Sequence, residues 1–512
     1  MPSSKNKDLL LAEKLNEEGK YEDAFKIIVD LEQNGELTLF ERISCNLIKG
    51  SVMVMLGRYN EVLNLAEQIL HESQKLGKRL QVVDALILKC KALYWLRRLD
   101  ESFEIIDKCE RLLETQNNES LLEIKQRKAW IAWGKGLFYK DKGESELQLK
   151  YLEQGLVLGE ETGSKEIIFK CLMLIGAYYT FIGEFDQALS YITRSLEVAN
   201  LMQNQIIIAW NFCNLAFIHY EKGELDNSIK YEKKAYQLFK KTKNELHMSI
   251  TLNNLGFIYM QKGEIPRALR YYERSLIINE EIGDPNSICI VLDSLISLTL
   301  EERDFKQAYL YFNRLKKIKN EEGNQKLVNL LYRFDKALIL KKDPQISNLD
   351  KAKTLLEQII NEEVLHFHVY IIALLELCDI LLIDLKDTND LKLIDIIKQY
   401  INKIIENAKR IHSYWLLAEI YLLQAKLELI TLDLNETQRS LTKAHKIAEK
   451  HGLNLLCTRI LNEKDELQEQ FSIWENFKNS KTIISDRIEL AHIDEQLIQL
   501  LRKRVSLEKV SF

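Results

Sequence analysis

The chain has few residues that break helices and no long apolar run. Its 512 residues include only 4 prolines and 19 glycines. Sheet proteins need frequent turn residues between short strands, so this scarcity argues against an all-β or Rossmann-like chain and favours helices. No stretch approaches 18 consecutive apolar residues, and residues 1–20 lack the apolar core of a secretory signal. We therefore expect no membrane insertion.

Cysteine spacing and charge narrow the class further. The eight cysteines are scattered, with no pair two or three residues apart, which is typical of neither a zinc site nor a disulfide scaffold. We expect buried thiols in a reducing, cytoplasmic compartment. The net charge of −5 argues against binding of nucleic acid or anionic membrane by the chain as a whole. A local basic patch could still bind a polyanion.

The sequence repeats itself with a period of 40 residues. Similar six-residue fragments begin at Gly143, Gly183, Gly223, Gly263 and Arg303. Such regular self-similarity is the signature of a repeat architecture. A second marker follows twenty residues after each of the five, so every period holds two turns and two helices; its members begin at Gly163, Gln203, Lys243, Gly283 and Gly323.

Weaker copies of the first marker extend the pattern in both directions. They begin at Gly19, Gly57 and Arg97 before the strong repeats, and at Ser347, Asn389 and Leu432 after them. The sequence therefore predicts about eleven helix-turn-helix units. Because a single pair of helices cannot bury its own apolar faces, stacking of neighbours must complete one continuous core.

The unit around Gly263 shows how a pair of helices would pack. Leu252, Leu255, Gly256 and Tyr259 recur at the spacing of one helix face. After the turn, Pro266 suits the start of a helix, where its missing N–H is not needed. The second helix carries Ala268, Tyr272 and Ser275 on one stripe. Small residues on both stripes let the two helices approach closely.

These residues resemble the tetratricopeptide repeat. The segment TLNNLGFIYMQKGEIPRALRYYERSLIINEEIGD is similar to the long-helix variants of kinesin light chains, and the resemblance covers about residues 5–450. It departs from the family at the turn residues Arg97 and Arg303, at the small-residue positions Gln148 and Ser228, and in an insertion at 341–348. The resemblance implies an all-α, right-handed superhelix whose first helices line a concave groove that binds a peptide segment.

The expected organisation has three parts. Residues 1–450 form the solenoid, with the strongest repeats at 125–322 and degenerate ones at 341–450. Residues 451–480 form a C-terminal capping helix, since a terminal repeat otherwise leaves an apolar face in water. Residues 481–512 form an amphipathic tail segment.

The candidate binding residues are the first-helix positions that do not face the core of their own unit. Asn214 and Asn254 occupy the same position 40 residues apart, and in similar repeats an asparagine there binds a ligand's backbone. An amide, with two donors and a carbonyl, suits such a bidentate role. The other candidates are mainly aromatic: Asn253, Trp210, Phe217, Tyr220, Phe257, Met260, Trp130 and Trp133. Two other interpretations stay open: the asparagines could bond a neighbouring loop, and the aromatics could belong to the core between repeats.

Nothing in the sequence predicts catalysis. His366 and His368 are two residues apart and would point to different sides of a helix, so we expect no metal there. No phosphate-binding or nucleophile motif occurs in its required strand context. The sequence predicts no enzyme activity, no metal and no cofactor.

The C-terminal end departs from the repeat. We expect one helix from about Leu453 to Phe477 as the cap, with the apolar face Leu456, Ile460, Leu467, Phe471 and Trp474. A second helix should follow Ser485 as its N-cap, with the stripe Leu490, Ile493, Leu497 and Leu501. This segment, 486–504, could dock on its own solenoid, pair with a second copy as a homodimer, or recruit a partner. A groove that accepts segments, in a chain whose tail is one, also raises the hypothesis of autoinhibition.

The sequence thus predicts a noncatalytic scaffold or adaptor that binds a peptide or helical segment of a partner protein. Two alternatives remain. One is a signalling regulator or peptide receptor of the kind that bacterial tetratricopeptide sensors represent. The other is an assembly scaffold that associates with itself through its C-terminal helix.

Overall fold

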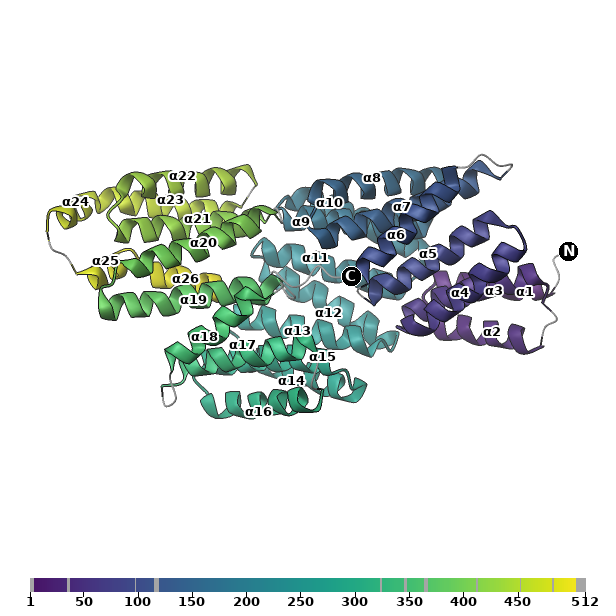
Figure 1. Ribbon diagram of the computed structural model, residues 1–512, viewed down its shortest axis with the longest axis horizontal. Helices are drawn as coiled ribbons and strands as arrows, with labels where there is room; N and C mark the ends of the chain where they lie inside the picture. Colours follow the sequence, from purple (N-terminus) through teal and green to yellow (C-terminus); the bar gives the residue numbers. More distant parts are fainter. Residues whose placement is uncertain are drawn as a thin grey trace. The chain divides into compact units, whose positions relative to one another are not determined.

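The computed structural model describes residues 4–34, 37–96, 98–114, 119–322, 325–344, 348–362, 367–410, 413–451, 453–480 and 483–502. Within these ranges the regular structure consists of α-helices, with no strand (Figure 1). The helices α1 to α22 follow one another as eleven pairs, which matches the number of units that the sequence predicts.

By its contacts the chain divides into two compact units, and the division falls within α11. Unit 1 comprises residues 1–179 and 186–214, and unit 2 comprises residues 180–185 and 215–512.

The helices of unit 1 are α1 (Ser4–Glu17), α2 (Tyr21–Asn34), α3 (Leu39–Met55), α4 (Tyr59–Lys75), α5 (Arg79–Trp95), α6 (Leu99–Glu114), α7 (Leu121–Lys142), α8 (Ser145–Thr162), most of α9 (Lys165–Phe181) and α10 (Phe185–Met202), and the first part of α11 (Gln205–Glu221). Unit 2 continues with α12 (Leu225–Lys241), α13 (Glu245–Gln261), α14 (Ile265–Ile282), α15 (Pro285–Glu301), α16 (Phe305–Glu321), α17 (Lys326–Lys342), α18 (Leu349–Asn361), α19 (Phe367–Thr388), α20 (Lys392–Arg410), α21 (Tyr414–Ile430), α22 (Leu434–Lys450), α23 (Asn454–Glu469), α24 (Phe471–Asn479), α25 (Ile484–Leu490) and α26 (Ile493–Arg502).

The turns between helices have the backbone conformation that the repeat register requires. The first-marker glycines at 143, 183, 223 and 263 all have positive φ, between 74° and 84°. The same left-handed conformation occurs at Arg303, Asn389 and Leu432, where the repeat has no glycine, with φ of 58°, 54° and 61°. A residue with a Cβ rarely adopts this conformation. The register of the turn therefore persists in the degenerate repeats.

Within a pair, glycine in the first helix lets the second helix approach closely. A Cβ added to Gly256 would lie 2.6 Å from the ring of Tyr272. Further along the same pair, the hydroxyl of Ser275 donates to the carbonyl of Ser249 at 2.8 Å, and both residues are buried. The small residues predicted on these stripes thus lie at the contact between α13 and α14.

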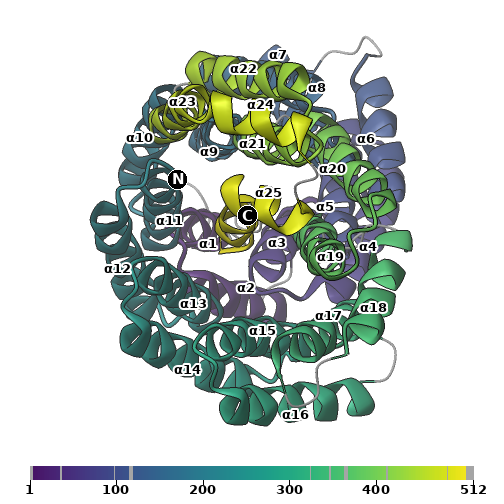
Figure 2. The same cartoon turned by 90° about the vertical axis from the view of Figure 1, so that its left-hand side faces the viewer.

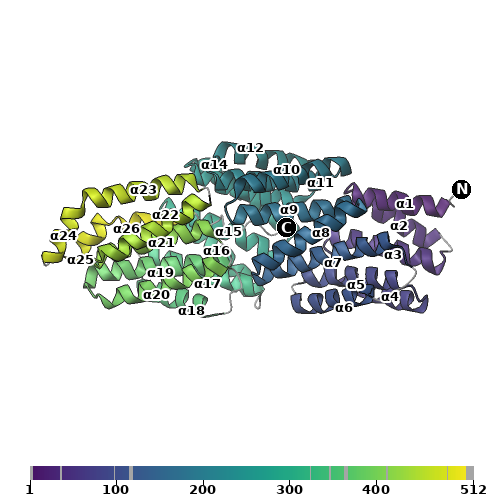
Figure 3. The same cartoon turned by 90° about the horizontal axis from the view of Figure 1, so that it is seen from above.

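The helices of unit 1 pack as successive neighbours, and α3 to α6 run side by side in Figure 3. One contact also joins segments far apart in this unit. Asn204, at the start of α11, is 1% exposed, and its Nδ2 donates to the carbonyl of Glu17 at 2.9 Å. Its Oδ1 accepts from the backbone N–H groups of Ile206 and Ile207, each at 3.1 Å. This asparagine therefore caps α11 and ties it to the end of α1.

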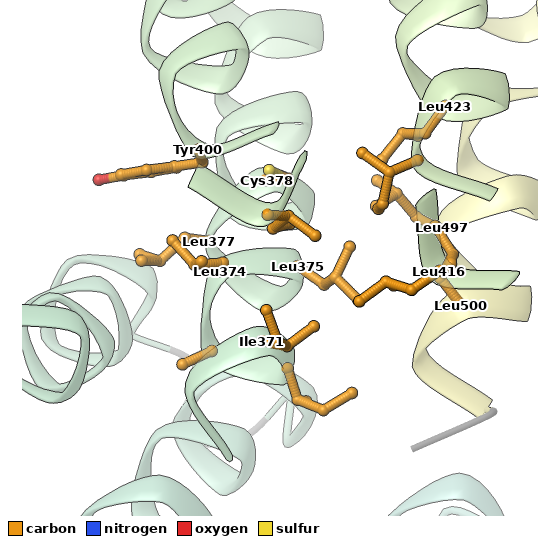
Figure 4. Close-up of a cluster of buried hydrophobic side chains, with 14 of the residues drawn as sticks. Ile371, Leu374, Leu375, Leu377, Cys378, Tyr400, Leu416, Leu423, Leu497 and Leu500 are labelled. Atoms are coloured by element: carbon orange, nitrogen blue, oxygen red, sulfur yellow. The ribbon is translucent and has the colours of Figure 1, made fainter. Parts of the chain in front are cut away.

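The tail packs back on the first helices of the late repeats. In unit 2, α25 and α26 contact α19 and α21 (Figure 2). Leu497 and Leu500 of α26 lie beside Leu416 and Leu423 of α21, and Leu375 of α19 points toward them (Figure 4). Of the three expectations for this segment, the structure shows docking on its own solenoid. Lys503 and Arg504 lie outside the described residues.

Three details of the C-terminal prediction are wrong. The expected capping helix is two helices, α23 and α24, which meet at Gln470, and Phe471 is 51% exposed there rather than on the buried face. The tail is also two short helices, because His492 has a φ of 48°. Ser485 lies inside α25, whose N-cap position is Ile483, so it is not the predicted cap.

Candidate interaction surfaces

The first helix α13 places Asn254 at the predicted position. Its side chain is only 6% exposed, and Nδ2 donates to the carboxylate of Glu232 on α12 at 2.8 Å. This bond fixes the orientation of the amide. Its Oδ1 is buried and has no hydrogen-bond partner among the described residues. A buried acceptor without a partner is costly, so this oxygen is suited to receive an N–H from a bound chain.

Asn214 occupies the equivalent position of α11, which lies in unit 1. It is 5% exposed, and its Nδ2 has no hydrogen-bond partner within the described part of the chain. The neighbouring candidate Asn253 is half-buried, and its Oδ1 is likewise without a described partner. The two asparagines in equivalent repeats thus share burial and an unsatisfied amide atom, and no loop carbonyl is recorded as the acceptor for Asn214 Nδ2.

The aromatic candidates of unit 2 divide into core and surface residues. Phe257 is 2% exposed and belongs to the hydrophobic core, where its ring lies 5.3 Å from that of Tyr220. Phe217, Tyr220 and Met260 are half-buried. The interpretation that an aromatic residue at this spacing belongs to the core therefore describes Phe257, while the other three keep part of their surface in solvent. Trp210, in the part of α11 that belongs to unit 1, is also half-buried.

In unit 1, the tryptophans of α7 are covered by lysines. The rings of Trp130 and Trp133 meet edge to face at 5.3 Å. The ammonium of Lys91 on α5 lies 3.7 Å from the centre of the Trp130 ring, and that of Lys170 on α9 lies 4.4 Å from it. A cation over an indole face is a favourable contact. The first helices of unit 1 therefore present ammonium groups over aromatic rings.

The two lysines differ in their ion pairs. Lys170 pairs with Glu166 at 3.1 Å, whereas Lys91 has no ion pair among the described residues. Burial, and then the nearby charge of Lys170, lower the pKa of the Lys91 ammonium to about 8. The sequence analysis began its list of wall residues at Trp130 and so missed Lys91. The signal that could have found it is a cation on the preceding first helix.

Buried polar contacts hold the tail in place on α21. The carboxylate of Glu419, whose side chain is 2% exposed, pairs with Arg459 of α23 and accepts from Gln496 of α26 at 2.8 Å. Lys426 pairs with Glu463 at 2.6 Å and donates to the carbonyl of Ala491 at 3.0 Å. These groups are directional, so they fix the position of the tail along α21.

The described residues contain no group of three or more His, Cys, Asp or Glu side chains placed to hold a metal ion. His366 lies outside them, as does the side chain of His368. All eight cysteines are free thiols. Within the same ranges, no helix has both the length and the apolar character needed to cross a membrane.

Comparisons with known proteins agree with this architecture. A model of the tetratricopeptide repeat matches residues 205–281. The apo form of the quorum sensor NprR from B. thuringiensis has a similar structure, with a TM-score of 0.52 at 16% identity over 71% of this chain and 100% of that one. A Rap protein complexed with Competence and Sporulation Factor gives a TM-score of 0.46 at 16% identity, over 73% and 96% of the two chains. No curated protein matches the sequence.

The likeness to NprR shows a shared fold, and the family model places tetratricopeptide repeats in α11 to α14. The predicted resemblance is thereby confirmed: the chain is an all-α solenoid built from tetratricopeptide-type helix pairs.

Proposed function

We propose that this protein is a noncatalytic scaffold that binds a peptide or helical segment of a partner protein along its first helices. The observation that carries the proposal is the pair of equivalent asparagines, Asn214 and Asn254, each buried and each with an amide atom that lacks a described partner. A peptide backbone offers one N–H and one C=O per residue, which these atoms can bond.

The protein's own tail supports this mode of binding. An amphipathic segment already lies on the first helices α19 and α21, where leucines provide burial and polar groups provide position. We expect a partner segment to use the same division of roles on α11 and α13, with backbone bonds to the asparagines. Preformed grooves of this kind bind with dissociation constants around micromolar, or roughly −8 kcal/mol.

A second candidate is a peptide receptor in a signalling system. Its support is the description of NprR as a quorum sensor, since NprR shares the fold. Both candidates require the same binding step. They differ afterwards, because a receptor must bind its peptide more tightly in one conformation than in another.

The binding step can be tested with a displayed library of short random peptides selected on the full chain. A selected peptide should bind the wild type with micromolar affinity in calorimetry. Asn214→Ala and Asn254→Ala should each weaken binding by roughly 1 kcal/mol, about fivefold. The matched control is Asn313→Ala, because Asn313 is an exposed asparagine on the second helix α16.

Circular dichroism must first show that each variant is folded, because Asn254 also bonds the buried Glu232. Peptides that bind both asparagine variants as tightly as the control would contradict the proposal. So would selection that yields no binding peptide from a diverse library.

A further inference from the structure

A basic pocket lies on unit 2, between the second helices α12 and α14 and the end of α13. Its volume is about 380 Å³, and its lining is Lys233, Tyr259, Arg267, Arg270, Tyr271 and Arg274. Four of the six residues are cations, the other two are tyrosines, and none is acidic. This pocket is separate from the asparagines of the first-helix face, and the proposed function does not use it.

The tyrosines form a fixed wall with donors around it. The rings of Tyr259 and Tyr271 stack at 5.3 Å with an angle of 4° between them. Lys233 donates to the hydroxyl oxygen of Tyr259 at 2.9 Å, so the hydroxyl's own proton remains available for donation. On the far side of Arg274, the hydroxyl of Tyr236 accepts from its guanidinium at 2.9 Å in the same way.

The repeat register shows that one counter-charge is replaced here. Arg194, Arg274 and Arg314 occupy equivalent positions in three second helices. Arg194 pairs with Glu160 and Arg314 pairs with Glu280, and in both cases the carboxylate lies 34 residues earlier. The residue 34 positions before Arg274 is Lys240. A carboxylate that neutralises the equivalent arginines is therefore a lysine in this repeat.

The remaining cations are also short of carboxylates. Arg267 pairs with Glu264 at 2.5 Å. Arg270 bonds only the carbonyl of Pro266, through Nε, and Lys233 bonds only a hydroxyl, so within the described residues neither has an ion pair. Three cations thus converge on one pocket without an acidic partner, in a chain whose net charge is −5. Like charges held together in this way favour an anion that carries more than one charge.

We propose that the pocket formed by Lys233, Arg270, Arg274 and Tyr259 binds the phosphoryl group of a ligand. A phosphate monoester or diphosphate has close to two negative charges or more and several acceptor oxygens, and two guanidinium groups can bond these oxygens in pairs. A single carboxylate would satisfy only one of the three cations. The phosphoryl group can come from a small metabolite or from a phosphorylated side chain of another protein, and both present the same chemistry.

The test is calorimetry on the full chain at fixed ionic strength with three probes: pyrophosphate, a short phosphoserine peptide and succinate. We expect pyrophosphate or the phosphoserine peptide to bind, and the better of the two identifies the source of the phosphoryl group. Succinate, a dianion without phosphorus, should bind at least tenfold more weakly. The double variant R270Q/R274Q should weaken phosphoryl binding at least tenfold.

The matched control is R314Q, which removes an equivalent arginine that already has a carboxylate partner, and it should change binding less than twofold. Lys233→Met provides a second variant should the double variant fail to fold, and it should also weaken binding. The proposal is overturned if neither phosphoryl probe binds at millimolar concentration, if succinate binds as tightly, or if R314Q weakens binding as much as R270Q/R274Q. None of these outcomes affects the proposed binding at Asn214 and Asn254.

Discussion

The first helices α21 and α13 belong to the same architecture and differ in what covers them. Both have 17 residues, but 14 residues of α21 are buried against 9 of α13. The tail accounts for the difference, because α25 and α26 pack on α21 and not on α13. A first-helix face of this fold becomes core when a segment of the chain lies on it. Without such a segment it keeps polar atoms that lack partners, as at Asn254.

The polar groups of the two helices differ accordingly. On α21, Glu419 and Lys426 are buried charges with partners on both α23 and the tail. Burying a charge costs several kcal/mol unless an opposite charge and hydrogen bonds compensate it. On α13, the polar group is a neutral amide whose unsatisfied oxygen costs much less. We infer that the late repeats use polar groups to fix a permanent contact, whereas the central repeats carry groups suited to an exchangeable one.

The largest expected effect is at Arg459, the charge that compensates Glu419. Arg459→Met leaves a carboxylate that is 2% exposed with Gln496 as its remaining side-chain partner. Removing one member of a buried ion pair costs about 3–5 kcal/mol. We expect a loss of stability of about that size in urea unfolding, together with earlier proteolysis of the tail.

The double variant Glu419→Leu/Arg459→Met separates charge burial from packing. Replacing both members of a buried pair by apolar residues is often close to neutral, so the double variant should recover most of the lost stability. If both variants are equally unstable, the pair acts through packing and the comparison with α13 loses its electrostatic basis.

The next effect is at Leu497, which is fully buried where α26 meets α21. Leu497→Ala removes buried apolar volume and should lower the free energy of unfolding by about 3 kcal/mol. The control is Ile498→Ala, because Ile498 follows it on the same helix and is 45% exposed, so its loss should cost well under 1 kcal/mol. Equal effects of the two changes in urea unfolding would show that the docked position of α26 is not the stable one in solution.

The repeat register was predictable from the sequence because each turn needs one residue with a left-handed backbone. Glycine marks that position in the strong repeats, and the 40-residue spacing locates it at Arg303 even though glycine is absent. The tail was not predictable in the same way. Its stripe predicts one helix, but the chain breaks at His492, and the carbonyl just before the break, that of Ala491, accepts from Lys426. A tertiary contact here accompanies a local conformation that sequence periodicity does not encode.

The candidate surface was predictable in position more than in chemistry. Repeat spacing alone placed Asn214 and Asn254 at equivalent, buried sites. It could not show that Phe257 turns into the core, since a residue at the edge of a helix stripe can face either way. Nor could it reveal the cation of Lys91 over Trp130, because that contact joins two first helices whose relative rotation depends on packing.

The smallest expected effect is at Asn214, and it separates an amide kept for binding from one kept for folding. Asn214 Nδ2 has no described partner, so Asn214→Ala removes an unsatisfied donor and should change the free energy of unfolding by no more than about 0.5 kcal/mol. The matched comparison is Asn204→Ala in the same unit. Asn204 is equally buried, but it makes three hydrogen bonds to backbone groups, and their loss should cost about 2 kcal/mol. Urea unfolding of both variants provides the measurement. A loss at Asn214 as large as that at Asn204 would mean that this amide serves the fold, and the distinction between permanent and exchangeable first-helix faces would then fail at its central residue.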